Sequence, residues 1–174
     1  MKGKNSQMSE NIKICLPTSS DWDRLVDVTH GNDFIMHWRD VLSWCRDSET
    51  NSAFCRTIRG YSSARYGEEF GKHRDSLVGF RPAVRLPSPG TSPDGALITI
   101  GTLYMNGKPI RVPTNPTWSG NIISYVPNVK LEIRAPIQNA AYQVKAIKVG
   151  NLLIADRVML KNISWDDLHT HGFC

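Results

Sequence analysis

A short segment rich in proline and glycine divides the sequence. Residues 87–95 read PSPGTSPDG, with three prolines and two glycines. Proline lacks a backbone N–H and glycine loses the most conformational freedom on ordering, so neither a helix nor a central strand is expected to run through this segment. We therefore predict a linker here, with one region before it at 12–86 and a second after it at 96–174. Residues 1–11 are polar and are expected to form a flexible N-terminus.

The region before the linker is expected to combine one helix with strands. Residues 21–29 (DWDRLVDVT) carry apolar side chains at helical spacing, and three hydroxyl residues that can cap a helix precede them. Apolar alternation at 12–16 and 54–61, and the segment 78–86, indicate strands. The segment 34–47 (FIMHWRDVLSWCRD) fits either a short helix or a bulged strand. The predicted core of this region consists of Trp22, Trp38, Trp44, Ile58 and Phe80.

Strands and tight turns dominate the region after the linker. Asn106-Gly107 separates two strand-like runs and supplies the positive φ angles that a type I′ hairpin turn requires. Gly150-Asn151 is expected to turn a second hairpin. Ser164, with Asp167 three residues later, predicts a capped helical turn. The predicted fold class is therefore α+β, with a β-rich C-terminal half.

Composition bounds the class of protein. Of the 174 residues, 40% are hydrophobic and 21% are charged, which is typical of a soluble globular chain. No run of about 18 apolar residues occurs that could span a membrane. The four cysteines show no CxxC spacing, and no apolar segment follows the basic first residues. We therefore expect a reducing compartment, the cytoplasm, with free thiols, although a disulfide stays open.

Four motifs in the first region occur in the order found in a known family. ICLPTSSDW, MHWRDVLSWCRD, RTIRGYSSAR and VGFRPAV together resemble the formylglycine-generating-enzyme group, also called sulfatase-modifying-factor-like proteins. The resemblance covers 12–86 and implies a shortened C-type-lectin-like core. Similar chains, with GFRP at the last motif, are found among uncharacterised phage or mobile-element proteins of Gram-positive bacteria. The second half resembles parts of the same uncharacterised group.

The resemblance does not extend to the enzyme's chemistry. Activity in that family depends on a cysteine pair that holds copper shortly before GFR, and residues between Gly60 and Gly79 include no cysteine. Cys45 and Cys55 lie in other segments. We therefore expect no catalysis and no cofactor. The family's other use, a ligand-binding surface as in phage tail adhesins, needs no catalytic residue.

The segment between two of these motifs is the predicted binding surface. It mixes tyrosine, phenylalanine and arginine, which are enriched in binding hot spots. An ordinary solvated loop is the alternative. The candidate binding residues are Tyr61, Arg65, Tyr66, Glu68, Phe70, Lys72 and Arg74.

Basic residues are concentrated around the same segment. Residues 56–85 contain seven basic and three acidic side chains, so 7 − 3 gives +4 of the net charge of +5. If these side chains share a face they could steer an acidic partner, nucleic acid included; general solubility is the alternative. Arg59 and Arg81 lie inside strand-like motifs and are expected to pair with core acids or carbonyls.

Signals for a metal or a catalytic site are weak. His169, His171 and Cys174 form an H-x-H-x-x-C tail that lacks a fourth ligand nearby, so a frayed tail competes with a metal site. Neither a nucleophile motif nor a glycine-rich nucleotide loop occurs.

These observations lead to one functional expectation and one alternative. We expect a non-enzymatic phage or mobile-element protein that binds a host protein or nucleoprotein complex in the host cytoplasm. Its most concrete form is an inhibitor of a host nuclease defence, of the anti-CRISPR type. The alternative is a virion adhesin or tail component that binds a cell-surface ligand.

Overall fold

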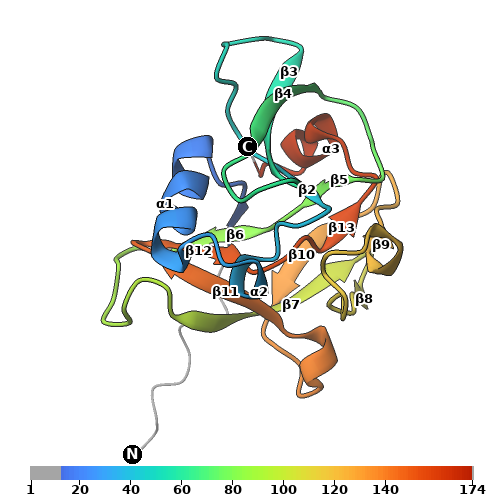
Figure 1. Cartoon of the computed structure of the whole chain (residues 1–174). Coiled ribbons are helices and arrows are strands. Elements are labelled where there is room, and N and C mark those ends of the chain that lie inside the picture. The colour runs from blue at the N-terminus through green and yellow to red at the C-terminus, as the bar shows by residue number, and fades with distance from the viewer. Residues whose placement is uncertain (1–12, 174) are drawn as a thin grey trace, which may run out of the picture.

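The structure, a computed structural model, describes residues 13–173 and is dominated by strands (Figure 1). Strands hold 33% of the chain and helices 17%, so the predicted α+β class is wrong and the fold is β-rich. Two predictions account for the difference. The ambiguous segment 34–47 ends in a strand, and the segment taken as a polar loop contains another. The predicted flexible N-terminus, 1–11, lies outside the described residues.

The larger sheet has seven strands in the order β1-β6-β12-β11-β7-β10, with β8 paired to β7, and every pairing in it is antiparallel. Its strands are β1 (Ile14–Cys15), β6 (Ala83–Arg85), β7 (Leu97–Met105), β8 (Lys108–Pro109), β10 (Leu131–Arg134), β11 (Val144–Val149) and β12 (Leu152–Ala155).

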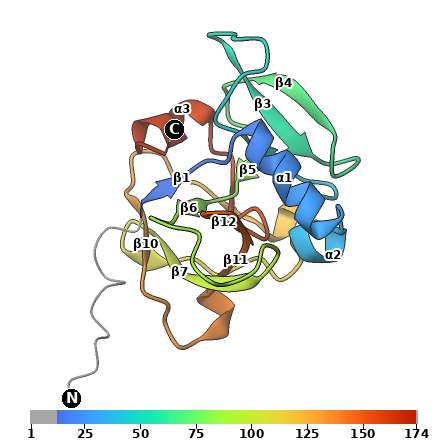
Figure 2. The ribbon, with the colours of Figure 1, turned by 90° about the vertical axis from the view of Figure 1, so that its left-hand side faces the viewer.

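The smaller sheet has six strands in the order β4-β3-β2-β5-β13-β9, and β2–β5 and β13–β9 are parallel pairs. Its strands are β2 (Leu42–Trp44), β3 (Cys55–Gly60), β4 (Gly67–Gly71), β5 (Val78–Phe80), β9 (Ile123–Ser124) and β13 (Leu160–Lys161). The β3–β4 hairpin projects from the body of the molecule in both ribbon views (Figures 1 and 2).

Both sheets contain strands from each side of the 87–95 segment. That segment forms no helix or strand, as predicted, and connects β6 to β7. The chain passes from the smaller to the larger sheet at Arg81-Pro82, between β5 and β6. The two halves of the sequence therefore build one structure together.

Apolar side chains pack on both faces of the larger sheet. On one face Ile147 and Ile154 lie under α1 (Ser19–Thr29), and on the other Ala146 and Leu153 belong to the core between the two sheets. Four of the five predicted core residues are fully buried, and Trp38 is partly buried. Trp22 belongs to the cluster under α1, whereas Trp44, Ile58 and Phe80 belong to the core between the sheets.

The strongest local signals are confirmed. Thr18 and Asp21 form a capping box at the start of α1, and Ser164 and Asp167 form another at α3 (Trp165–Thr170). Asn106 and Gly107 both have positive φ, 52° and 76°, and join β7 to β8. Gly150 and Asn151 join β11 to β12. No helix within residues 13–173 is long and apolar enough to cross a membrane.

Candidate binding face

A short helix presents two apolar side chains to solvent. In α2 (Asp33–Met36) the side chain of Asn32 accepts a hydrogen bond from the Phe34 N–H at 2.9 Å. The Asp33 carboxylate accepts from the backbone N–H groups of Trp38 (3.0 Å) and Arg39 (2.9 Å). These caps satisfy backbone donors at both ends of the single turn. In this turn 89% of the surface of Phe34 is exposed to solvent, and Ile35 beside it is also exposed.

The turn between β3 and β4 is hydrogen-bonded to the segment that follows α2. The Tyr61 N–H donates to the Trp38 carbonyl at 2.8 Å, and the Asp40 N–H donates to the Tyr61 carbonyl at 3.0 Å. The indole N–H of the buried Trp22 donates to the Ala64 carbonyl at 2.7 Å. The turn is therefore fixed from α1 and from α2, and Figure 2 shows it on the same side of the molecule as α2.

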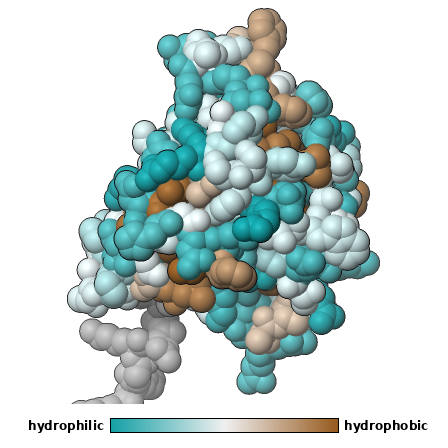
Figure 3. Space-filling model, in the orientation of Figure 1, coloured by the Kyte–Doolittle hydropathy of each residue, from teal (hydrophilic) through white to brown (hydrophobic). Residues whose placement is uncertain are grey.

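We call this surface the α2–turn face and define it as Phe34, Ile35, Arg39, Tyr61, Arg65 and Tyr66. All six residues are at least partly exposed at their side chains. Hydrophobic side chains gather around α2 on an otherwise mainly hydrophilic view (Figure 3).

One residue of this face, Tyr61, has an unusual backbone conformation. Tyr61 has a φ of 77°, whereas His30, His37 and Asp40, which also have positive φ, are of residue types that adopt this region more readily. Residues with an unusual backbone conformation persist only where their surroundings hold them, and they cluster at functional sites. Tyr61 as a residue is 40% exposed, while its backbone N–H and carbonyl are both hydrogen-bonded.

The structure separates the seven predicted binding residues into two groups. Tyr61, Arg65, Tyr66 and Glu68 lie at or near the start of β4, and the Tyr66 hydroxyl donates to Glu68 at 2.8 Å. Beyond the middle of β4 the other three face α3 or the core. Phe70 packs against the Trp44 ring, Lys72 lies 3.7 Å from Asp166, and Arg74 makes two hydrogen bonds to Asp167.

Sequence reasoning did not find Phe34, Ile35 and Arg39. Their segment was ambiguous between helix and strand, and an apolar pair such as Phe34-Ile35 is usually buried. Asn32-Asp33 is the sequence signal that could have indicated the pair. Asn32 is the N-cap of α2 and His37 is its C-cap, so the helix has a single turn.

The basic surplus of 56–85 is largely offset by acids from elsewhere in the chain. Arg81 is fully buried, and Arg56 stacks on the Trp165 ring. Four of the other five basic residues form ion pairs. These are Arg59 with Glu49 (2.8 Å) and Asp23 (3.7 Å), Arg65 with Asp27 (2.6 Å), Lys72 with Asp166 (3.7 Å) and Arg74 with Asp167 (2.7 Å). A single basic face does not form here, which weakens steering of an acidic partner.

Arg81 has the structural role predicted for it. Its guanidinium donates to the carbonyls of Met36 (2.5 Å), His37 (2.9 Å) and Ala155 (3.2 Å), and to the Ser43 hydroxyl at 3.1 Å. It therefore anchors the C-terminal end of α2 to both sheets, directly behind the α2–turn face.

The histidine tail does not assemble a metal site among the described residues. His169 stacks on Trp165 and the His171 ring nitrogen lies 2.9 Å from the Tyr125 hydroxyl, while Cys174 is outside residues 13–173. No group of three possible metal ligands occurs in the part of the chain that the structure describes.

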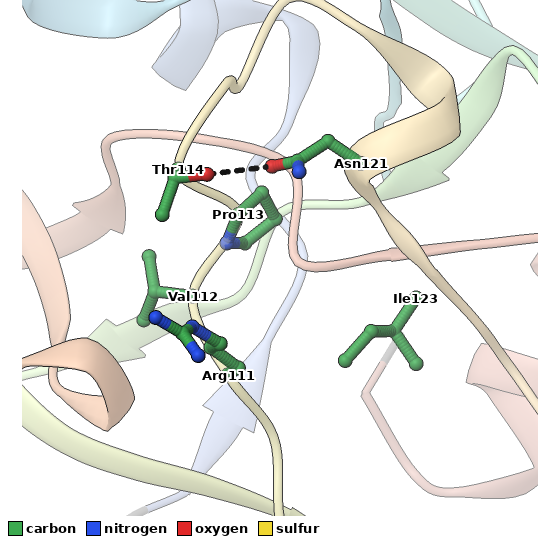
Figure 4. A pocket seen from close by; sticks show the side chains of 6 residues that line it. All are labelled: Arg111, Val112, Pro113, Thr114, Asn121 and Ile123. Atoms are coloured by element: carbon green, nitrogen blue, oxygen red, sulfur yellow. Dashed lines mark hydrogen bonds between the residues drawn. The ribbon is translucent and has the colours of Figure 1, made fainter.

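A hollow of about 310 Å³ lies beside the segment 111–114 (Figure 4). The Arg157 guanidinium donates to the Pro113 carbonyl at 2.7 Å, and the Thr114 hydroxyl lies 3.4 Å from the Asn121 side-chain oxygen. The only ionisable side chain in its lining is Arg111, so the lining itself supplies no acid/base pair. The lining residues are Arg111, Val112, Pro113, Thr114, Asn121 and Ile123.

His37 lies between α2 and a buried ion pair. Its Nε2 is 3.4 Å from Nη2 of Arg157 and 3.9 Å from Oδ2 of Asp156. Burial, reinforced by the Arg157 charge, lowers the pKa of His37. The imidazole is therefore held neutral, with Nε2 free to accept from Arg157.

Stability is expected to fall as the pH drops below about 6.5, the ordinary pKa of histidine. The folded state holds His37 neutral, so the unfolded state binds more protons in this range and acid favours unfolding. Burial lowers the pKa of His171 and acts in the same direction. Urea unfolding between pH 7.5 and 5 measures the effect. His37→Asn, which tolerates the left-handed backbone, should flatten the profile, and a variant profile parallel to the wild type would contradict this assignment.

Comparison with protein-family models, curated proteins and solved structures gives no match. The resemblance of 12–86 to the formylglycine-generating-enzyme group therefore stays a prediction.

Proposed function

We propose that this chain is a non-enzymatic phage or mobile-element protein that binds a host macromolecule through the α2–turn face. The observation that carries the proposal is Tyr61, an exposed aromatic residue held in a left-handed conformation by backbone hydrogen bonds on both sides. The concrete form remains an inhibitor of a host nuclease defence acting in the host cytoplasm. That part rests on the sequence resemblance and on the missing cysteine pair.

The composition and rigidity of the α2–turn face support this role. Aromatic and arginine side chains dominate binding hot spots, and the face combines four aromatic or aliphatic side chains with Arg39 and Arg65. The capped helix and the anchored turn are already ordered, so binding loses little conformational entropy. Covering an exposed phenylalanine ring such as Phe34 contributes about 2 kcal/mol.

Capture from a bacterial lysate followed by nuclease assays tests the proposal. We expect the tagged chain to retain a nuclease defence complex and to inhibit its cleavage of DNA. Phe34→Ala and Tyr61→Asn should each weaken binding about 30-fold, or ~2 kcal/mol, with little change in folding stability.

Phe54→Ala is the matched control for Phe34→Ala. Phe54 is 82% exposed and lies at the opposite end of β3 from the turn, so its removal should leave binding unchanged. The proposal fails if no defence complex is retained or inhibited, or if the Phe54 variant loses as much affinity as the Phe34 variant. Binding to intact cells by a trimeric or larger assembly would instead support the adhesin alternative.

A further inference from the structure

Three basic side chains from separate segments line a second hollow, of about 140 Å³. We call it the basic pocket; its lining is Lys13, Cys15, Arg46, Arg85, Gly172 and Phe173. It lies where β1, β6 and the end of α3 meet, and Figure 2 shows these elements away from α2. It is therefore separate from the α2–turn face.

Strand pairing and one loop contact bring the three charges together. In the antiparallel β1–β6 pair Ile14 lies opposite Val84, so the register carries Lys13 opposite Arg85. The backbone N–H of Arg46 donates to the Pro17 carbonyl at 2.9 Å, which holds Arg46 beside the end of β1.

None of the three side chains forms an ion pair with a carboxylate of residues 13–173, although the Asp21 charge also acts at the Cys15 thiol. The Arg85 guanidinium donates to the neutral Asn151 side chain at 3.4 Å. Arg65, Lys72 and Arg74 each have a carboxylate partner, as described above. Like charges opposite one another on paired strands destabilise a sheet, so an anion bound near Lys13 and Arg85 would relieve their repulsion.

The charges converge on the interior of the pocket. Burial raises the pKa of the Cys15 thiol and the Asp21 carboxylate adds to this effect, whereas the charges of Arg85, Arg46 and Lys13 each act in the opposite direction. All three are thus close enough to be felt at one atom in the pocket wall. The thiol itself stays protonated at neutral pH, so it adds no negative charge to the pocket and the three basic side chains can interact with a bound anion.

We propose that the basic pocket binds a phosphate group, using Lys13, Arg46 and Arg85 as its donors. Guanidinium groups bind phosphate oxygens in a two-pronged geometry, and the lysine adds a compact charge. A hollow of about 140 Å³ has room for a phosphate group.

Titration with inorganic phosphate at constant ionic strength, followed by amide NMR shifts, tests the site. We expect saturable shifts confined to residues around 13–15, 46, 85 and 172–173. Lys13→Ala and Arg46→Ala should each weaken phosphate binding about tenfold. They should not lower stability without phosphate, because each relieves repulsion.

Two matched controls carry the same loss of charge elsewhere. Lys108→Ala and Arg111→Ala remove exposed basic residues that have no carboxylate partner within 13–173, and both should leave the phosphate affinity unchanged. A second titration with a short single-stranded DNA identifies the source. Tighter binding of DNA that weakens with Lys13→Ala indicates backbone phosphate, and binding of inorganic phosphate alone indicates a small phosphorylated ligand. The proposal is overturned if neither probe binds, or if Lys108→Ala weakens binding as much as Lys13→Ala.

Discussion

Replacing Arg81 with methionine is expected to lower the free energy of unfolding by about 4 kcal/mol. The Arg81 side chain is fully buried, and it donates to three backbone carbonyls and to the Ser43 hydroxyl. Methionine fills much of the volume but leaves the carbonyls of Met36, His37 and Ala155 without this donor. Urea unfolding of the purified variant measures the loss.

Two further variants make the Arg81 prediction specific. Arg81→Lys keeps the charge but cannot reach several acceptors in a fixed fork, so it should recover less than half of the lost stability. Arg111→Met makes the same exchange at an exposed site and should change stability by less than about 0.5 kcal/mol. Near-wild-type stability of Arg81→Met would show that the buried guanidinium is not the anchor described here.

Replacing Gly79 with alanine is expected to lower the free energy of unfolding by about 3 kcal/mol. A Cβ atom at this position would lie 2.2 Å from Cγ1 of Val158 and 2.5 Å from the Leu160 carbonyl oxygen. The second contact is with backbone, so β5 and β13 would have to separate, and their pairing joins the two halves of the chain.

Gly71→Ala is the matched control in another strand, β4, of the same sheet. There the nearest atom is the imidazole Nδ1 of His73, at 2.9 Å, which a side-chain rotation can move. We expect a loss of less than about 1 kcal/mol at Gly71, measured by the same unfolding experiment. Equal losses at Gly71 and Gly79 would argue against a close approach of β13 to β5.

The GFRP motif illustrates what the sequence does reveal. Its four residues were grouped by resemblance, and each has a distinct physical task in the fold. Gly79 admits β13, Phe80 fills the core between the sheets, Arg81 binds carbonyls, and Pro82 lies buried where the chain changes sheets. The short motif was informative because each of its four residues has its structural role at its own position in the chain.

Local elements were predictable for the same reason. A capping box needs only Thr18 and Asp21, and a type I′ turn needs only Asn106-Gly107. The residues that determine each of these elements are therefore close together in the sequence. Strand β4 was missed because GEEFG has no apolar alternation, and its pairing with β3 comes from a partner segment. The fold class was wrong because such distant pairings decide it.

The candidate site was predictable only in part. The seven residues were grouped by their closeness in sequence, but β4 is extended and carries Tyr66 and Lys72 to its two ends. Phe34 joins Tyr61 on one surface through the contacts of Trp38 and Asp40, which no sequence pattern displays. The basic pocket likewise depends on the β1–β6 register.

The position of β13 between β5 and β9 has a consequence for synthesis of the chain on the ribosome. Residues 78–80 leave the ribosome some eighty residues before Leu160 and Lys161, the partners that cover one edge of their strand. Until then this edge keeps its backbone groups open to other chains, which favours association of nascent molecules. Closure depends on contacts distant in sequence, so folding is expected to be slow.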